Sequence, residues 1–111
     1  MSRREMVARE VWRSGPVTAA RYGRVVTVYL PAGSMIPGAK IGSSATPAKL
    51  PDGWRPVLVA NSAILTDQGA FQAHVCVMPS GDVNVAVGSA GGTAQNGGVM
   101  LTRSISVTYV C

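Results

Sequence analysis

Hydrophobic and polar residues alternate along several short segments of the chain, the pattern of β-strands with one buried face. The clearest example, Ala70–Met78, places Phe71, Ala73, Val75 and Val77 on one face and Gln72, His74, Cys76 and Met78 on the other. Asp82–Val87 alternates in the same way, with Val83, Val85 and Val87 on its apolar face. Pro79-Ser80-Gly81-Asp82 joins the two segments with typical turn residues. We therefore expect a β-hairpin from Ala70 to Val87.

Four further segments are candidate strands. Arg24–Leu30 is rich in β-branched and aromatic residues. Ser104–Val110 alternates, with Ile105, Val107 and Tyr109 facing inward and Ser104, Ser106 and Thr108 facing outward. Pro56–Leu65 is a long apolar run, typical of a strand buried on both faces or bent between two sheets. Ser2–Arg13 fits either a short helix, with a capping box from Ser2 to Glu5, or an opening strand, and we favour the strand.

Two segments rich in glycine, proline or serine interrupt this pattern. Pro31–Pro51 and Gly88–Gly98 are both expected to be long loops. Short strands at this spacing predict an all-β fold, which we take to be a single small antiparallel β-sandwich of the jelly-roll type. The expected domain covers residues 14–111, preceded by an extension or first strand over residues 1–13.

Composition and charge narrow the function classes. Of 111 residues, 47% are hydrophobic and 14% charged, which is typical of a folded domain. The net charge is +5, but five of the ten basic residues lie in the first 21 positions and none lies between Pro56 and Thr102. This clustering argues against a nucleic-acid groove. We expect no membrane insertion, because no uninterrupted apolar stretch approaches the roughly 18 residues of a membrane span.

The sequence offers little for catalysis. His74 and Cys76 lie two residues apart on one strand face, about 7 Å along the strand, which is too far for the hydrogen bond of a Cys–His pair. The acids lie in the N-terminal segment or beside turn glycines, where Asp commonly caps a turn. We therefore expect no enzyme activity, no metal site and no cofactor. The charged N-terminus lacks the apolar run of a signal peptide, so Cys76 and Cys111 are expected to be reduced thiols of a chain made in the cytoplasm.

A binding surface is easier to derive. If the last strand pairs with the hairpin, one outward face carries Gln72, His74, Asn84, Ser106 and Thr108. Neutral donors and acceptors of this kind suit hydroxyl-rich ligands such as saccharides. The alternative is a solvated or subunit-facing surface. Trp54 either stacks on a sugar or anchors the preceding turn to the core, and Trp12 is either a core residue or a contact between protomers.

Leu50-Pro51-Asp52-Gly53-Trp54-Arg55-Pro56 resembles a signature of the C-terminal domains of bacteriophage tail-fibre, baseplate and minor structural proteins, mainly from phages of Gram-positive hosts. The stretches 21–28, 79–85 and 106–110 resemble other parts of that family, so the resemblance spans about residues 11–111. The chain departs from the family in two ways. Only about ten residues precede the domain, where the family usually has a long fibre, and the segment Gly88–Gly98 is longer than expected. The motif residues that match look architectural, with Arg55 bonding backbone or a carboxylate near the turn; they are Leu50, Gly53, Arg55, Pro56 and Gly81.

This resemblance implies a homotrimeric β-sandwich at a fibre or baseplate tip in the virion tail. It implies binding to host cell-wall saccharide or teichoic acid, and contacts with other phage tail proteins. One alternative is a purely structural virion module that binds no glycan. A second is a basic module that binds anionic polymers through its arginine-rich N-terminus, with steep salt dependence.

Overall fold

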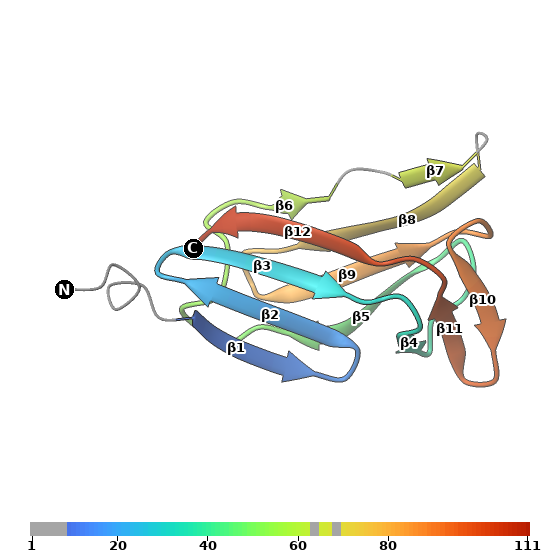
Figure 1. The fold of residues 1–111 in the computed structure, drawn as a ribbon, viewed down its shortest axis with the longest axis horizontal. Helices are drawn as coiled ribbons and strands as arrows, with labels where there is room; N and C mark the ends of the chain where they lie inside the picture. Colours follow the sequence, from blue (N-terminus) through green and yellow to red (C-terminus); the bar gives the residue numbers. More distant parts are fainter. Residues whose placement is uncertain (1–8, 63–64, 68–69) are drawn as a thin grey trace.

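The computed structural model describes residues 9–62, 65–67 and 70–111 (Figure 1). The described residues form strands and turns without a helix, which confirms the all-β prediction. The predicted capping box at Ser2 and Glu5 and the side chain of Phe71 lie outside the described part.

The first antiparallel sheet has four strands in the order β1-β2-β3-β12. Its strands are β1 (Arg9–Ser14), β2 (Val17–Tyr22), β3 (Val25–Leu30) and β12 (Ile105–Val110). The two hairpin turns begin with Gly15 and Gly23, at φ of 56° and 59°. A glycine at positive φ in the first central position suits a two-residue hairpin turn. Residues 9–13 are thus extended, as favoured from the sequence, and β3 and β12 match their predicted segments.

The second sheet has five strands, with β5-β9-β8-β6 in order and β7 also paired with β8. They are β5 (Ser44–Lys49), β6 (Ala60–Asn61), β7 (Leu65–Asp67), β8 (Ala70–Val77) and β9 (Asp82–Val87). The predicted hairpin is confirmed, with Val75 opposite Val85. Its turn is closed by Gly81 N donating to Met78 O over 2.8 Å, and Gly81 has a φ of 95°.

A third sheet, in the order β10-β11-β4, corrects both loop predictions. Its strands are β4 (Met35–Pro37), β10 (Gly92–Gln95) and β11 (Gly98–Leu101). The segment 31–51 also contains β5, whose register shifts between Ala45 and Ala48, next to Pro47. A bulge is one of the few places where a sheet accepts proline. Most of the glycine-rich segment 88–98 therefore belongs to a hairpin and its turns.

The apolar run 56–65 is not a long buried strand. Among the described residues of this run, only Ala60, Asn61 and Leu65 belong to strands, and these strands pair with β8. Val57 and Leu58 are 73% and 79% exposed, because the chain after Pro56 runs over the surface before it joins the sheet edge. Apolar character alone does not distinguish these residues from core residues.

The buried side chains of the three sheets form one hydrophobic cluster. The four-stranded sheet contributes Val17, Ala19, Val26, Val28 and Leu30, and the five-stranded sheet contributes Val75, Val77, Val83, Val85 and Val87. The predicted inward face of the last strand is confirmed, since Ile105, Val107 and Tyr109 are buried and Ser106 and Thr108 exposed. Trp12 is half-buried and packs against the cluster.

Candidate functional site

Two of the four predicted ligand residues, His74 and Asn84, share the outer face of the five-stranded sheet. His74 lies opposite Ala86 and Asn84 opposite Cys76, so the two polar residues are diagonal neighbours on adjacent strands. Thr46 Oγ1 donates to Asn84 Oδ1 over 2.5 Å, which orients the amide. We call this surface the neutral polar face; its residues are Ser44, Thr46, Asn61, His74, Cys76 and Asn84, all half-buried or exposed. Its side chains offer hydrogen-bond donors and acceptors, and Asp82, on the same side of β9 as Asn84, adds a carboxylate at the turn end of the face.

Gln72 has the same strand phase as His74 but is only 5% exposed. The turn after β9 packs on it, since Gly88 N donates to Gln72 O over 2.8 Å. A Cβ on Gly91 would lie 2.1 Å from the same oxygen, so the approach of the two backbones requires glycine there. The structure therefore places Gln72 under a turn, away from the exposed part of the face.

Ser106 and Thr108 do not join the neutral polar face, which corrects the expected grouping. Their strand β12 pairs with β3 in the other sheet, not with the hairpin. The Oγ1 atoms of Thr108 and Thr27 share a hydrogen bond of 2.9 Å across that pairing. The sequence pattern predicted the inner and outer sides of β12 but contains no signal for its partner strand.

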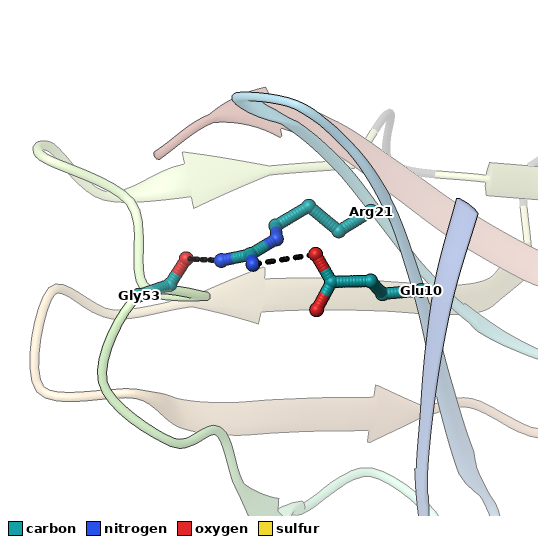
Figure 2. A network of polar contacts seen from close by, with 3 residues as sticks. All are labelled: Glu10, Arg21 and Gly53. Atoms are coloured by element: carbon teal, nitrogen blue, oxygen red, sulfur yellow. Dashed lines mark hydrogen bonds and ion pairs between the residues drawn. The ribbon is translucent and has the colours of Figure 1, made fainter. Parts of the chain in front are cut away.

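Trp54 occupies the packing-anchor position rather than an open ligand surface. The preceding residue of the turn, Gly53, lies in a network of polar contacts with Arg21 and Glu10 (Figure 2). Trp54 is 8% exposed, and the Arg21 guanidinium lies 5.1 Å from its ring centroid. Arg21 also donates to Gly53 O and to a carboxylate oxygen of Glu10, each over 2.7 Å. Tyr109 donates its hydroxyl hydrogen to Trp54 O. These contacts tie the turn to the four-stranded sheet, and we call this group the Trp54 anchor.

Arg55 completes the same turn from its other side. Its Nε donates to Leu50 O over 2.9 Å, and its Nη1 lies 3.0 Å from an Asp52 carboxylate oxygen. Arg55 was expected to bond backbone or a carboxylate near the turn, and it contacts both. Gly53, at a φ of 86°, provides the left-handed position of the turn. The motif that carries the phage resemblance is thus architectural in this chain.

The Trp54 anchor predicts a loss of stability in alkali. Burial, with a smaller contribution from the charge of Cys111, raises the pKa of Tyr109 well above its ordinary value of about 10. In the unfolded chain Tyr109 ionises near pH 10, whereas the folded chain keeps it neutral, so its contribution is complete below pH 10 and lost as pH rises further. Urea unfolding between pH 8 and 11 should show the free energy of unfolding falling above about pH 10. Tyr109→Phe should flatten that fall; a variant whose stability falls as steeply as that of the unmodified protein would contradict the assignment.

The outer side of the four-stranded sheet is a second candidate surface. Across β2, β3 and β12, every outward position is uncharged; we call this set the uncharged sheet face, and it comprises Thr18, Ala20, Tyr22, Val25, Thr27, Tyr29, Ser106, Thr108 and Val110. The edge strand β1 borders it with two exposed charges on the same side, Arg9 opposite Tyr22 and Arg13 opposite Thr18. Four large apolar or aromatic side chains of the uncharged sheet face are 41–57% exposed, namely Tyr22, Val25, Tyr29 and Val110. Sequence reasoning did not identify this face, because the strand over 17–22 was not predicted and the order of the strands was unknown.

A groove of about 380 Å³ is the third candidate. It lies between the loop after β4 and the β10–β11 hairpin. These two elements are at the end of the molecule opposite the C-terminus (Figure 1). The residues that line the groove are Gly38, Ala39, Lys40, Ile41, Ala94, Gln95, Gly97, Gly98 and Val99. All lining residues except Val99 fall in the two segments predicted to be loops, so the glycine-rich composition of these segments was the available sequence signal.

Other chemistry is sparse in the described part of the chain. Cys76 and Cys111 are free thiols, and Cys76 Sγ lies 3.6 Å from Met78 Sδ. Among the described residues, no three His, Cys, Asp or Glu side chains are grouped so as to hold a metal ion. The same residues contain no helix long and apolar enough to cross a membrane.

Comparison of the chain with protein-family models, curated proteins and solved structures gave no match.

Proposed function

We propose that this protein is a tip domain of a phage tail fibre or baseplate, a β-sandwich that assembles as a homotrimer and binds host cell-wall saccharide or teichoic acid. Its place is then the virion tail, in contact with other phage tail proteins. The sandwich arrangement is supported by the single hydrophobic cluster shared by the inner faces of the two larger sheets. The observation that carries the proposal is the uncharged sheet face.

A solvent-facing sheet surface usually carries charged side chains, whereas the centres of subunit interfaces are depleted of them and enriched in aromatic residues. The uncharged sheet face has nine outward positions without a charge, two of them tyrosines. Thr27 lies at its centre, opposite both Ala20 and Thr108. In the proposed trimer, this face packs against neighbouring copies of the chain.

Saccharide binding is assigned to the neutral polar face, which lies on the other large sheet and stays accessible when the uncharged sheet face is covered. His74 and Asn84 supply the donors and acceptors there, supported by Thr46. A shallow face of this kind binds a single sugar weakly, but three copies on one particle raise the avidity by 10²–10⁴-fold.

A purely structural virion module is the second candidate. It is favoured by the burial of Gln72 and Trp54, at 5% and 8% exposure, which removes half of the predicted ligand residues from solvent. Both candidate functions predict a trimer, and only the first predicts saccharide binding.

Thr27→Lys tests the assembly, because it places a charge at the centre of the uncharged sheet face. Light scattering should show a change from trimer to monomer, and binding to purified cell walls should fall by at least about 100-fold with the loss of avidity. Thr46→Lys, the same substitution on the other large sheet, is the matched control for assembly. A Thr27→Lys protein that remains trimeric would overturn the assigned interface. A trimer that binds no cell-wall saccharide would select the structural alternative.

A further inference from the structure

The groove beside the β10–β11 hairpin is hollow because its walls are built from small residues. Five of its nine lining residues are glycine or alanine. Gly38 N donates to Gly97 O over 2.8 Å, which holds the loop against the hairpin. Gly98 lies so close to β4 that a Cβ there would be 2.2 Å from Ile36 O, so no side chain fills this side. Hydrogen bonds within the fold therefore form the groove, whose volume falls in the usual range for ligand sites, about 300–1,000 Å³.

The lining combines apolar surface with one positive charge. Ala39 and Val99 are buried, at 7% and 1% exposure, and Ile41 adds an exposed apolar side chain. Lys40 and Gln95 are exposed and supply an ammonium and an amide group. No lining residue is acidic, so the charge of Lys40 is not balanced by a carboxylate in the lining.

We infer that this groove binds an anionic, hydroxyl-rich ligand: an acidic saccharide or polyol whose negative group pairs with Lys40, whose hydroxyls bond Gln95, and whose C–H surface lies on the apolar lining. An ammonium group favours a negative partner, and as a point charge it donates hydrogen bonds equally well to a carboxylate or a phosphate. The same loop continues into β5, where Ser44 shares a row with Ala86 and His74 on the neutral polar face. The inference rests on the proposed saccharide-binding function and adds a charged site to it.

The test is an NMR titration of the intact protein with three probes: a hexuronic acid disaccharide, its neutral hexose counterpart, and glycerol 3-phosphate. We expect shift changes at residues 38–41 and 94–99 with the anionic probes, and at least about tenfold weaker binding of the neutral sugar. The two anionic probes distinguish a carboxylated saccharide from a polyol phosphate as the source of the charge.

The variants use the two lysines of the chain as a matched pair. Lys40→Gln should weaken the anionic probes at least about tenfold, whereas Lys49→Gln, on β5 outside the groove, should leave them unchanged. Ala94→Leu should abolish binding by filling the groove while the fold, followed by its NMR spectrum, is retained. Equal binding of neutral and anionic probes, absence of binding, or equal effects of the two lysine variants would overturn the inference. A trimer that binds cell walls but shows no ligand in the groove would contradict this inference and support the proposed function. Failure of the inference is therefore distinguishable from failure of the proposed function.

Discussion

Replacing Trp54 by alanine should lower the free energy of unfolding by about 3–5 kcal/mol, as expected for removal of a large aromatic side chain from a packed core. Trp54 is 8% exposed and belongs to the main hydrophobic cluster. Its removal also leaves the Arg21 guanidinium without the ring beneath it. Small domains have about 5–15 kcal/mol of total stability, so this substitution alone brings the protein close to unfolding.

Urea denaturation measures this effect, with two variants as controls. Trp54→Phe keeps an aromatic ring in the anchor and should lose less than the alanine variant. Leu58→Ala, four residues along the chain at 79% exposure, should change stability by less than about 0.5 kcal/mol. A Trp54→Ala protein within 1 kcal/mol of the unmodified protein would contradict the anchor role.

Gly91→Ala should be the second most damaging change, at about 3 kcal/mol, the upper end of ordinary overpacking costs. The added Cβ would lie 2.1 Å from Gln72 O and 2.5 Å from Gln72 C, which are backbone atoms that cannot rotate away. Gly91 is itself held in place, because its oxygen accepts from Thr102 N over 3.0 Å. The hairpin must therefore move away from β8, and its own packing is lost with that movement.

The matched substitution is Ser89→Ala, at an exposed position in the same turn, which should be close to neutral. Thermal unfolding of both variants, with hydrogen exchange of the amides in β10 and β11, separates a local from a global effect. If Gly91→Ala were as stable as Ser89→Ala, the close backbone contact would be wrong.

The parts of the fold that the sequence predicted are those whose signals are local. The β8–β9 hairpin follows from two alternating segments joined by a turn, and the inward face of β12 follows from the spacing of Ile105, Val107 and Tyr109. Strand pairing over long distances has no such signal. Thr27 and Thr108 are 81 residues apart and lie side by side, and this pairing separates Ser106 and Thr108 from the hairpin.

The missed strands have sequences that usually indicate loops. Residues 88–98 are rich in glycine, but Gly91 and Gly98 are needed because neighbouring backbones approach too closely for a side chain. β5 contains Pro47, which a regular strand rejects and a bulge accommodates. Amino-acid composition indicates which local conformations a segment can adopt. The strands at these positions form through contacts with residues that are distant in the sequence.

The candidate site was predictable only in part, for the same reason. The alternation of apolar and polar residues correctly predicted that His74 and Asn84 share one outer face. It predicted the same side of the sheet for Gln72. The turn at Gly88 covers Gln72, and Trp54 is held by contacts with Arg21 and Tyr109 of the four-stranded sheet. The groove arises from the loop after β4 and a hairpin nearly sixty residues further on, so it exists only in the folded chain.

We propose that copies of this chain associate through the uncharged sheet face, and the solution mass of the protein depends on that association. Light scattering on a size-exclusion column, over a range of protein concentrations, should give a species near three times the chain mass of 11.5 kDa. A single species of 11.5 kDa at every concentration would contradict the homotrimer and leave the uncharged sheet face without its assigned partner.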